Sequence, residues 1–222
     1  MTYCKAESRT SEKGFSLIEM LIAMTVTLVV AGLASTLLAT SLNISTRENA
    51  RTDSIADVQR GLNIMAREIS IGGYGFDVNS NGIVAGDSDA ASIRVRSNLN
   101  RYTNNSTATT EINEDIKYFL GTSGDKSFLV RYDSNAAGGS QGTLLANRID
   151  RLNIKYWSVS NTELDVAADP TQVANAVALT ISVSVTLQAV GSRGSAGYQP
   201  ATPIQLSSYV ALRNKGANLS SY

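Results

Sequence analysis

The sequence predicts an α+β protein in which one long N-terminal helix packs against an antiparallel β-sheet. Residues 20–46 contain no charged residue and no proline. Apolar residues then recur three and four positions apart as far as Ile69, which is typical of an amphipathic helix. Beyond Gly75 apolar and polar residues alternate instead, and this period of two is typical of strands. A helix followed by strands indicates the α+β class and one globular domain.

We expect a single continuous helix over residues 16–71, about 84 Å long at about 1.5 Å per residue. No proline or glycine interrupts residues 34–60, so the amphipathic part should continue the apolar part. Gly72 and Gly73 are expected to end the helix, because glycine readily adopts the positive φ that a helix terminus often needs. The apolar stripe that should face the sheet consists of Ile55, Val58, Leu62, Met65 and Ile69.

The apolar run from Phe15 to Leu42 predicts a membrane anchor. A spanning helix needs roughly 20 apolar residues, whereas the core of a cleaved secretory signal has only about 7 to 15. No small-residue cleavage site closes the run. Basic residues precede the run and favour a cytoplasmic N-terminus; they are Lys5, Arg9 and Lys13. The protein is therefore predicted to cross a membrane once.

Glu19 is the one carboxylate at the start of this apolar run. Because a charge inside a membrane is costly, such a residue predicts a functional role with a specific partner. A cut between Gly14 and Phe15 would place a new α-amino group four residues from Glu19, on the same helix face. The alternative is that Glu19 lies at the membrane edge and extends its carboxylate to the lipid headgroups.

The region after the helix contains short alternating segments that predict strands. The expected strands are residues 93–96, 116–120, 128–132, 143–146, 149–157, 177–187 and 206–212. Residues 121–125 are expected to form the turn of a hairpin. The strongest signal lies in residues 177–187, where six apolar residues alternate with small and polar ones. This segment predicts a central strand with one buried face.

The segment 13–23 has the sequence Lys-Gly-Phe-Ser-Leu-Ile-Glu-Met-Leu-Ile-Ala. It resembles the class III signal of type IV pilins and of the pseudopilins of type II secretion. The resemblance implies that a prepilin peptidase cleaves after Gly14 and methylates the new N-terminus at Phe15. It also implies that Glu19 forms an assembly salt bridge with a subunit N-terminus, and that the fold is the pilin fold.

This resemblance divides the chain into three parts. Residues 1–14 would form a leader peptide that is cleaved, and residues 15–46 the transmembrane and assembly half of the long helix. Residues 47–222 would form the globular pilin domain, in which an amphipathic helix over residues 47–72 packs on the antiparallel sheet.

Shorter motifs make the chain most similar to minor pilins of the PilW type. They are residues 65–69 followed by Gly73-Tyr74, residues 147–152 and residues 210–214. This similarity implies a minor pilin that initiates assembly of a type IV pilus with other major and minor pilins and an inner-membrane assembly platform. The C-terminal domain would lie in the periplasm before assembly and on the pilus at the cell surface afterwards. J-type minor pseudopilins of type II secretion share this architecture and are the alternative.

The composition argues against enzymatic and nucleic-acid-binding functions. Basic and acidic residues are equal in number, at 19 each, so the chain has no general attraction for nucleic acid. The chain has no histidine, which excludes histidine-based catalytic triads and histidine metal sites. The single cysteine, Cys4, lies in the predicted leader, so the mature chain can form no internal disulfide. We therefore expect a structural protein without a nucleic-acid partner.

Residues 77–82 match the start of a calcium-binding loop, with oxygen-bearing side chains at alternate positions and a glycine at the turn. The twelfth position is Ser88 instead of glutamate, and a solvent-exposed turn is the alternative interpretation. An acidic cluster at residues 113–115 is equally well explained by solvation at a strand edge. A signal-anchored adhesin or a calcium-regulated binding module is accordingly a further hypothesis. The candidate calcium ligands are Asp77, Asn79, Asn81 and Asp87.

Overall fold

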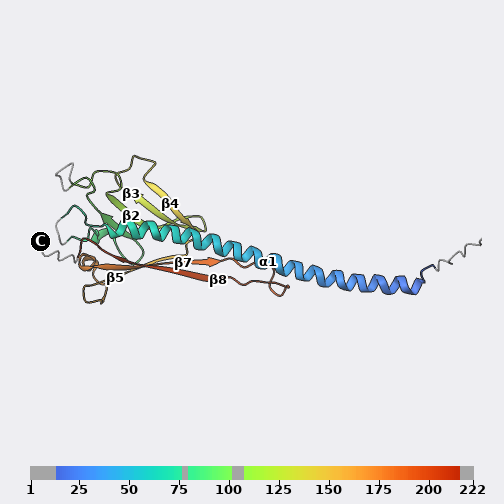
Figure 1. Cartoon of the computed structure of the whole chain (residues 1–222). Coiled ribbons are helices and arrows are strands. Elements are labelled where there is room, and N and C mark those ends of the chain that lie inside the picture. The colour runs from blue at the N-terminus through green and yellow to red at the C-terminus, as the bar shows by residue number, and fades with distance from the viewer. Residues whose placement is uncertain (1–13, 77–79, 102–107, 216–222) are drawn as a thin grey trace, which may run out of the picture.

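The computed structural model describes residues 14–76, 80–101 and 108–215. One helix dominates the molecule: α1 spans Leu17–Ser70, and its N-terminal half extends away from the globular part (Figure 1). The expected helix over residues 16–71 is thus confirmed to within one residue at each end. Two short 3₁₀ helices, η1 (Ala85–Asp87) and η2 (Pro170–Asn175), lie in connections and were not predicted, because they are too short to show a period.

Among the described residues, eight strands form two antiparallel sheets. The first sheet has the order β1-β2-β3-β4, with β1 (Ile93–Arg96), β2 (Asp115–Ser123), β3 (Lys126–Asp133) and β4 (Gly142–Asn147). The second has the order β6-β5-β7-β8, with β5 (Arg151–Trp157), β6 (Glu163–Leu164), β7 (Ala178–Leu187) and β8 (Thr202–Ala211). The α+β class is therefore confirmed.

The sequence predicts one sheet, whereas the structure has two. The division falls between β4 and β5, where Arg148 adopts a positive φ of 57° and turns the chain out of the first sheet. The main chain of Ile149 still donates to Ser127 in the first sheet, but that of Asp150 donates to Ser184 in the second. Alternation identifies a strand without identifying its partner, because the period of two is the same in every pairing.

Helix α1 lies between the two sheets and contacts β4, β7 and β8 (Figure 1). The predicted stripe provides its core contacts: Val58, Leu62, Met65 and Ile69 are buried, and Ile55 is half-buried. Gly61 is buried beside them, and a Cβ atom there would lie 3.0 Å from Leu129 Cδ2. The absence of a side chain at Gly61 therefore lets the helix pack closely on the first sheet.

Strand β7 is the central strand that the sequence predicts for residues 177–187, and it lies between β5 and β8. Leu179, Ile181 and Val183 are fully buried along its length. Strand β8 begins at Thr202, four residues before the predicted start at 206, because it pairs with the whole of β7. Pro203 made this start hard to predict from the sequence, since proline is compatible with a strand only at a sheet edge or a strand start.

The β2–β3 hairpin is tighter than the predicted turn at residues 121–125. Strand β2 continues to Ser123 and β3 begins at Lys126, so the turn consists of Gly124 and Asp125. Gly124 supplies the positive φ, at 59°. Gly121, which indicated a turn, lies inside β2, where it is paired with Phe128.

The helix ends at the two predicted glycines, Gly72 and Gly73, which lie beside the main chain of β1, of Ser80 and of the segment after β8. The N–H of Gly73 donates to the carbonyl of Arg96 in β1 at 2.9 Å. Gly73 has a positive φ of 79°, and a Cβ atom there would lie 2.0 Å from the carbonyl oxygen of Ser80. The carboxamide of Asn214, beyond β8, donates to the carbonyls of Gly73 and Ser80. Only glycine fits at position 73 without moving the main chain.

Candidate functional site

The predicted cleavage site, between Gly14 and Phe15, lies at the start of the described residues and is exposed. Phe15 is 90% exposed, and a Cβ atom added to Gly14 would have no neighbouring atom within 4 Å. Ser16 is the N-cap residue of α1, and the helix itself begins at Leu17. Both residues that flank the predicted cut are therefore accessible to an enzyme in this conformation.

Glu19 lies in the first turn of α1 and is part of its cap. One carboxylate oxygen, Oε2, accepts a hydrogen bond from the main-chain N–H of Ser16 at 2.9 Å. This bond satisfies one of the N–H groups that the start of a helix leaves without an intrahelical partner. The helix dipole also favours a negative charge at this end. The structure thus places Gly14, Phe15 and Glu19 together at the N-terminal end of α1.

The surface of α1 from Leu17 to Leu42 is apolar and uncovered. Its large apolar side chains are between 56% and 83% exposed. The most apolar stretch of 18 residues has a mean hydropathy of 2.3, and none of it is buried. The helix is therefore long and apolar enough to cross a membrane, as the sequence predicts.

Six hydroxyl groups in residues 25–46 do not disrupt the apolar surface, because they bond to their own helix. Each donates to a main-chain carbonyl three or four residues earlier, at 2.7–2.9 Å. A polar group that is satisfied in this way can enter lipid at a much smaller cost than an unpaired one. The hydroxyls that bond in this manner are those of Thr25, Thr27, Ser35, Thr36, Thr40 and Thr46.

Arg47, the first charged residue after Glu19, is buried against the globular domain, with a relative exposure of 7%. Its guanidinium donates to the carbonyl of Gln188 and, at 2.7 Å, to the carbonyl of Pro200. The sequence gives Arg47 only as part of a polar stretch of helix. Its role was missed because its two acceptors are more than 140 residues away in the chain and are main-chain atoms, which no residue pattern reveals.

Glu68 joins the helix to the first sheet through a mostly buried ion pair. Its carboxylate accepts a hydrogen bond from Arg131 Nε at 2.8 Å and another from the hydroxyl of Tyr118. The side chains of Arg131 and Glu68 are 12% and 16% exposed. Burial, together with the negative charge of Glu68, raises the pKa of the Tyr118 hydroxyl, which therefore stays protonated and donates. This contact fixes α1 on β2 and β3.

A network of charges surrounds Asp115 at the start of β2. Arg94 donates to both carboxylate oxygens, at 2.7 and 2.8 Å, and Arg96 donates to one of them at 2.9 Å. Arg94 also donates to the carboxylate of Asp87 at 2.7 Å, and Lys117 donates to the Asp87 carboxylate at 3.0 Å. The network connects η1 with β1 and β2.

The arginines lower the pKa of both carboxyl groups in this network. Burial raises the pKa of Asp115, but the hydrogen bonds and charges of Arg94 and Arg96 outweigh it and hold that pKa below its ordinary value of 3.8. Hydrogen bonds from Arg94 and Lys117 lower the pKa of Asp87 in the same way. A depressed folded-state pKa contributes stability that is present above the unfolded-state pKa and is lost as the pH falls through the folded-state value.

We predict that the free energy of unfolding falls as the pH is lowered below 3.8. The fall should be smaller in the variant Asp115→Asn than in the wild type. The variant lacks the carboxylate whose protonation would break the network, so its stability should depend less steeply on pH in this range. Unfolding of the full chain in detergent, followed from about pH 2 to pH 7, measures this slope. Glu163→Gln is the control, because that carboxylate is 46% exposed. An Asp115→Asn slope equal to the wild-type slope would contradict the prediction.

Both carboxylates of the acidic cluster at residues 113–115 are buried, and only Asn113 is exposed, so solvation at a strand edge does not explain the two acidic residues. Glu114 has a relative exposure of 0%. Its carboxylate accepts main-chain hydrogen bonds from Leu99 at 2.7 Å and from Glu111 at 3.0 Å. The neighbouring Asp115 is 4% exposed. The Glu114 carboxylate joins the main chain at Leu99 to that at Glu111. The polar residues around Glu114 in the sequence do not indicate that its side chain is buried.

Two of the four candidate calcium ligands lie in the described part of the chain, and both are engaged elsewhere. Asn81 is buried; its amide donates to two main-chain carbonyls at 2.6 and 3.0 Å, and its oxygen accepts from the N–H of Ile83. Asp87 is paired with Arg94 and Lys117. In this arrangement the two side chains do not fit a shared calcium ion.

The described residues contain no group of three or more acidic or cysteine side chains placed to hold a metal ion. Asp77 and Asn79, the other two candidate ligands, lie outside those residues. Calcium binding accordingly stays a prediction, which calorimetric titration of calcium into the full chain in detergent would test.

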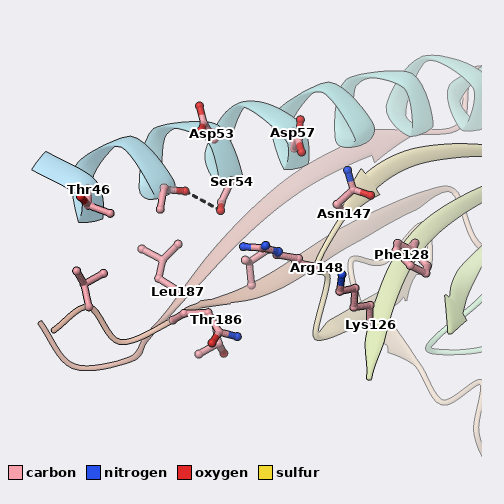
Figure 2. A pocket seen from close by; sticks show the side chains of 14 residues that line it. Thr46, Asp53, Ser54, Asp57, Lys126, Phe128, Asn147, Arg148, Thr186 and Leu187 are labelled. Atoms are coloured by element: carbon pink, nitrogen blue, oxygen red, sulfur yellow. Dashed lines mark hydrogen bonds between the residues drawn. The ribbon is translucent and has the colours of Figure 1, made fainter. Parts of the chain in front are cut away.

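A groove of about 640 Å³ lies between α1 and the ends of the two sheets, and Figure 2 shows the side chains that line it. Its lining mixes charges of both signs with apolar groups, and Lys126 and Arg148 enter it from the sheet side. The lining hydroxyl of Ser54 donates to the carbonyl of Ala50 at 2.8 Å, so it is occupied within the helix. None of the lining residues is a histidine or a cysteine, and their arrangement does not indicate a catalytic centre.

Residues 9–35 match a family model described as the prokaryotic N-terminal methylation motif. No curated protein matches the chain. This motif is the signal of type IV pilin-like prepilins, and the protein that carries it here has a pilin-like fold with an apolar N-terminal helix. The motif implies processing by a prepilin peptidase and assembly with other pilins, and its family is structural and not enzymatic.

Proposed function

We propose that this protein is a minor pilin, an assembly-initiating subunit of a type IV pilus. Prepilin peptidase would cleave between Gly14 and Phe15 and methylate Phe15. Before assembly α1 anchors the protein in the inner membrane, with the globular domain in the periplasm. During assembly the same half of the helix leaves the membrane and packs with the helices of other pilins in a fibre at the cell surface. The prepilin motif and the pilin-like fold support this proposal.

The observation that carries the proposal is the uncovered apolar half of α1. Its large apolar side chains from Leu17 to Leu42 are more than half exposed in the isolated chain. Exposed apolar area costs roughly 25 cal/mol per Å², so this surface needs a cover. Lipid is one such cover, and the apolar helices of other subunits are another, because both exclude water from the same residues.

Glu19 is the feature that favours a second environment beyond lipid. The helix cap that Glu19 forms with Ser16 needs a hydrogen-bond acceptor but no full charge, and no other residue from 14 to 46 carries a charge. In a bundle with little water an unpaired carboxylate costs several kcal/mol, and the α-amino group of a neighbouring subunit's Phe15 would relieve that cost. Pairing between Glu19 and Phe15 would thereby set the axial register between subunits.

We predict that the wild-type protein is recovered from sheared surface fibres without residues 1–14 and with one methyl group on Phe15. The variant Gly14→Val should stay full-length in the membrane fraction, because a branched side chain would obstruct the peptidase at the exposed cleavage site. Intact-mass spectrometry of both fractions measures the outcome.

Gly32→Val is the matched control for this experiment. Gly32 lies in the same apolar run, and a Cβ atom there would have no neighbour within 4 Å, so processing should be normal. A mature N-methylated chain from the Gly14→Val variant would contradict the proposed cleavage. Recovery of the mature wild-type chain with a type II secretion complex, and not with fibres, would show that the protein is a minor pseudopilin and not a minor pilin.

A further inference from the structure

The loop between β7 and β8, residues 188–201, reaches along α1 beyond the ends of both strands (Figure 1). Two of its three glycines, Gly191 and Gly197, rest against the helix. A Cβ atom at Gly197 would lie 2.6 Å from Thr40 Cα, and one at Gly191 would lie 3.1 Å from Asn43 Nδ2. The loop therefore contacts the helix at the boundary between its apolar and amphipathic halves.

Arg47 fixes both ends of this loop to the helix. Its guanidinium donates to the carbonyl of Gln188, just after β7, and to the carbonyl of Pro200, just before β8. Val190 and Gln199 close the loop further through two main-chain hydrogen bonds of 2.9 Å. A buried cation that is bonded to two fixed carbonyls holds the loop at a defined height on the helix.

That height corresponds to the surface of a bilayer that contains the apolar half of α1. The helix rises about 30 Å between Met20 and Thr40 at about 1.5 Å per residue, which is the thickness of a hydrocarbon core. When Met20 lies at the near edge of that core, Thr40 lies at its far edge. The loop that touches Thr40 is then at the depth of the lipid headgroups.

The chemistry of the loop suits a layer of phosphate groups. Residues 188–201 contain no aspartate or glutamate, and Arg193 at the tip is exposed. Apart from Arg193, the tip consists of small residues, and Gly194 has no neighbouring atom within 4 Å of a Cβ position, so the main chain there can approach a flat surface closely. Tyr198 adds an aromatic side chain of the kind that is enriched at membrane interfaces.

We propose that the β7–β8 loop rests on the lipid headgroups of the membrane that holds α1, and that Arg193 binds their phosphates. This inference depends on the proposed membrane-anchored state. The loop would support the globular domain on the bilayer surface at a fixed distance and orientation before the subunit is extracted.

Fluorescence quenching in vesicles tests the contact. The full chain, with Cys4 replaced by serine, is labelled at single cysteines and inserted in vesicles that contain phosphatidylglycerol and a lipid with a nitroxide on its headgroup. A label at Ser192→Cys, in the exposed tip, should lose most of its fluorescence. A label at Ser160→Cys should lose none, because that residue follows the end of β5 opposite the loop.

A third label, at Leu28→Cys with a nitroxide on the lipid chain, reports whether the helix is inserted. Quenching at position 28 without quenching at 192 would overturn the loop contact alone, whereas no quenching at 28 would refute the anchored state itself. Arg193→Glu should reduce the quenching at 192, and Arg193→Lys should preserve it. Equal quenching at 192 in the glutamate variant and in the wild type would exclude Arg193 as the phosphate-binding residue.

Discussion

Replacement of Glu19 by alanine is expected to abolish incorporation of the subunit into fibres while cleavage after Gly14 continues. The carboxylate is the only charged group in the apolar half of α1, so its loss removes the proposed ion pair with Phe15 of a neighbouring subunit. Without that pair, hydrophobic packing between helices has no preferred axial register. Immunoblots of sheared fibres and of membranes, with intact-mass analysis of the membrane fraction, measure incorporation and cleavage separately.

Two further variants separate the charge of Glu19 from its hydrogen bond and from a general effect of losing a helix carboxylate. Glu19→Gln can still accept the hydrogen bond from Ser16 but carries no charge, and it should fail to assemble as alanine does. Glu48→Ala removes a carboxylate that is 59% exposed and lies beyond the apolar run, and it should assemble normally. Normal fibre incorporation of Glu19→Gln would show that the charge is not needed.

Glu68→Ala is expected to reduce the free energy of unfolding by about 1–3 kcal/mol, because it removes the acceptor of two mostly buried donors, Arg131 Nε and the Tyr118 hydroxyl. The side chain of Arg131 is only 12% exposed, and its Nε donates to Glu68 at 2.8 Å. The buried hydroxyl of Tyr118 loses its acceptor in the same variant. Chemical denaturation of the full chain in detergent, followed by the fluorescence of the single tryptophan, Trp157, measures the change.

The matched control is again Glu48→Ala on the same helix. Glu48 pairs with Arg51 at 3.7 Å, and the two side chains are 59% and 55% exposed, so solvent screens the pair and its loss should be barely measurable. The double variant Glu68→Leu with Arg131→Met should recover much of the lost stability, since apolar groups of similar size can replace a buried ion pair. A Glu68→Ala effect no larger than that of Glu48→Ala would refute the structural role of the pair.

The helix, the membrane anchor and the strands were predicted from local patterns. The stripe that ends at Ile69 and the alternation in β7 are features of neighbouring residues, and burial follows from them directly. The same holds for the glycines that end α1, because the positive φ of Gly73 is a local requirement. Glu19 was recognised for a similar reason: a lone charge in an apolar run is visible without any knowledge of contacts.

The partners of polar groups were not predictable in this way. Arg47 bonds to carbonyls near residues 188 and 200, Glu68 bonds to Arg131, and Glu114 is buried by loops around residue 99. Each of these contacts joins segments far apart in the chain, and several acceptors are main-chain atoms that every residue possesses.

The separation of the strands into two sheets has the same origin. Strand pairing depends on where the turn at Arg148 directs the chain, while the period of two is identical in all strands. Local composition and periodicity therefore established the long apolar helix, its single carboxylate and the α+β class. Three-dimensional packing alone established how the two sheets enclose α1 and how Arg47 holds the β7–β8 loop on it, because those contacts depend on distances in space that a local sequence does not record.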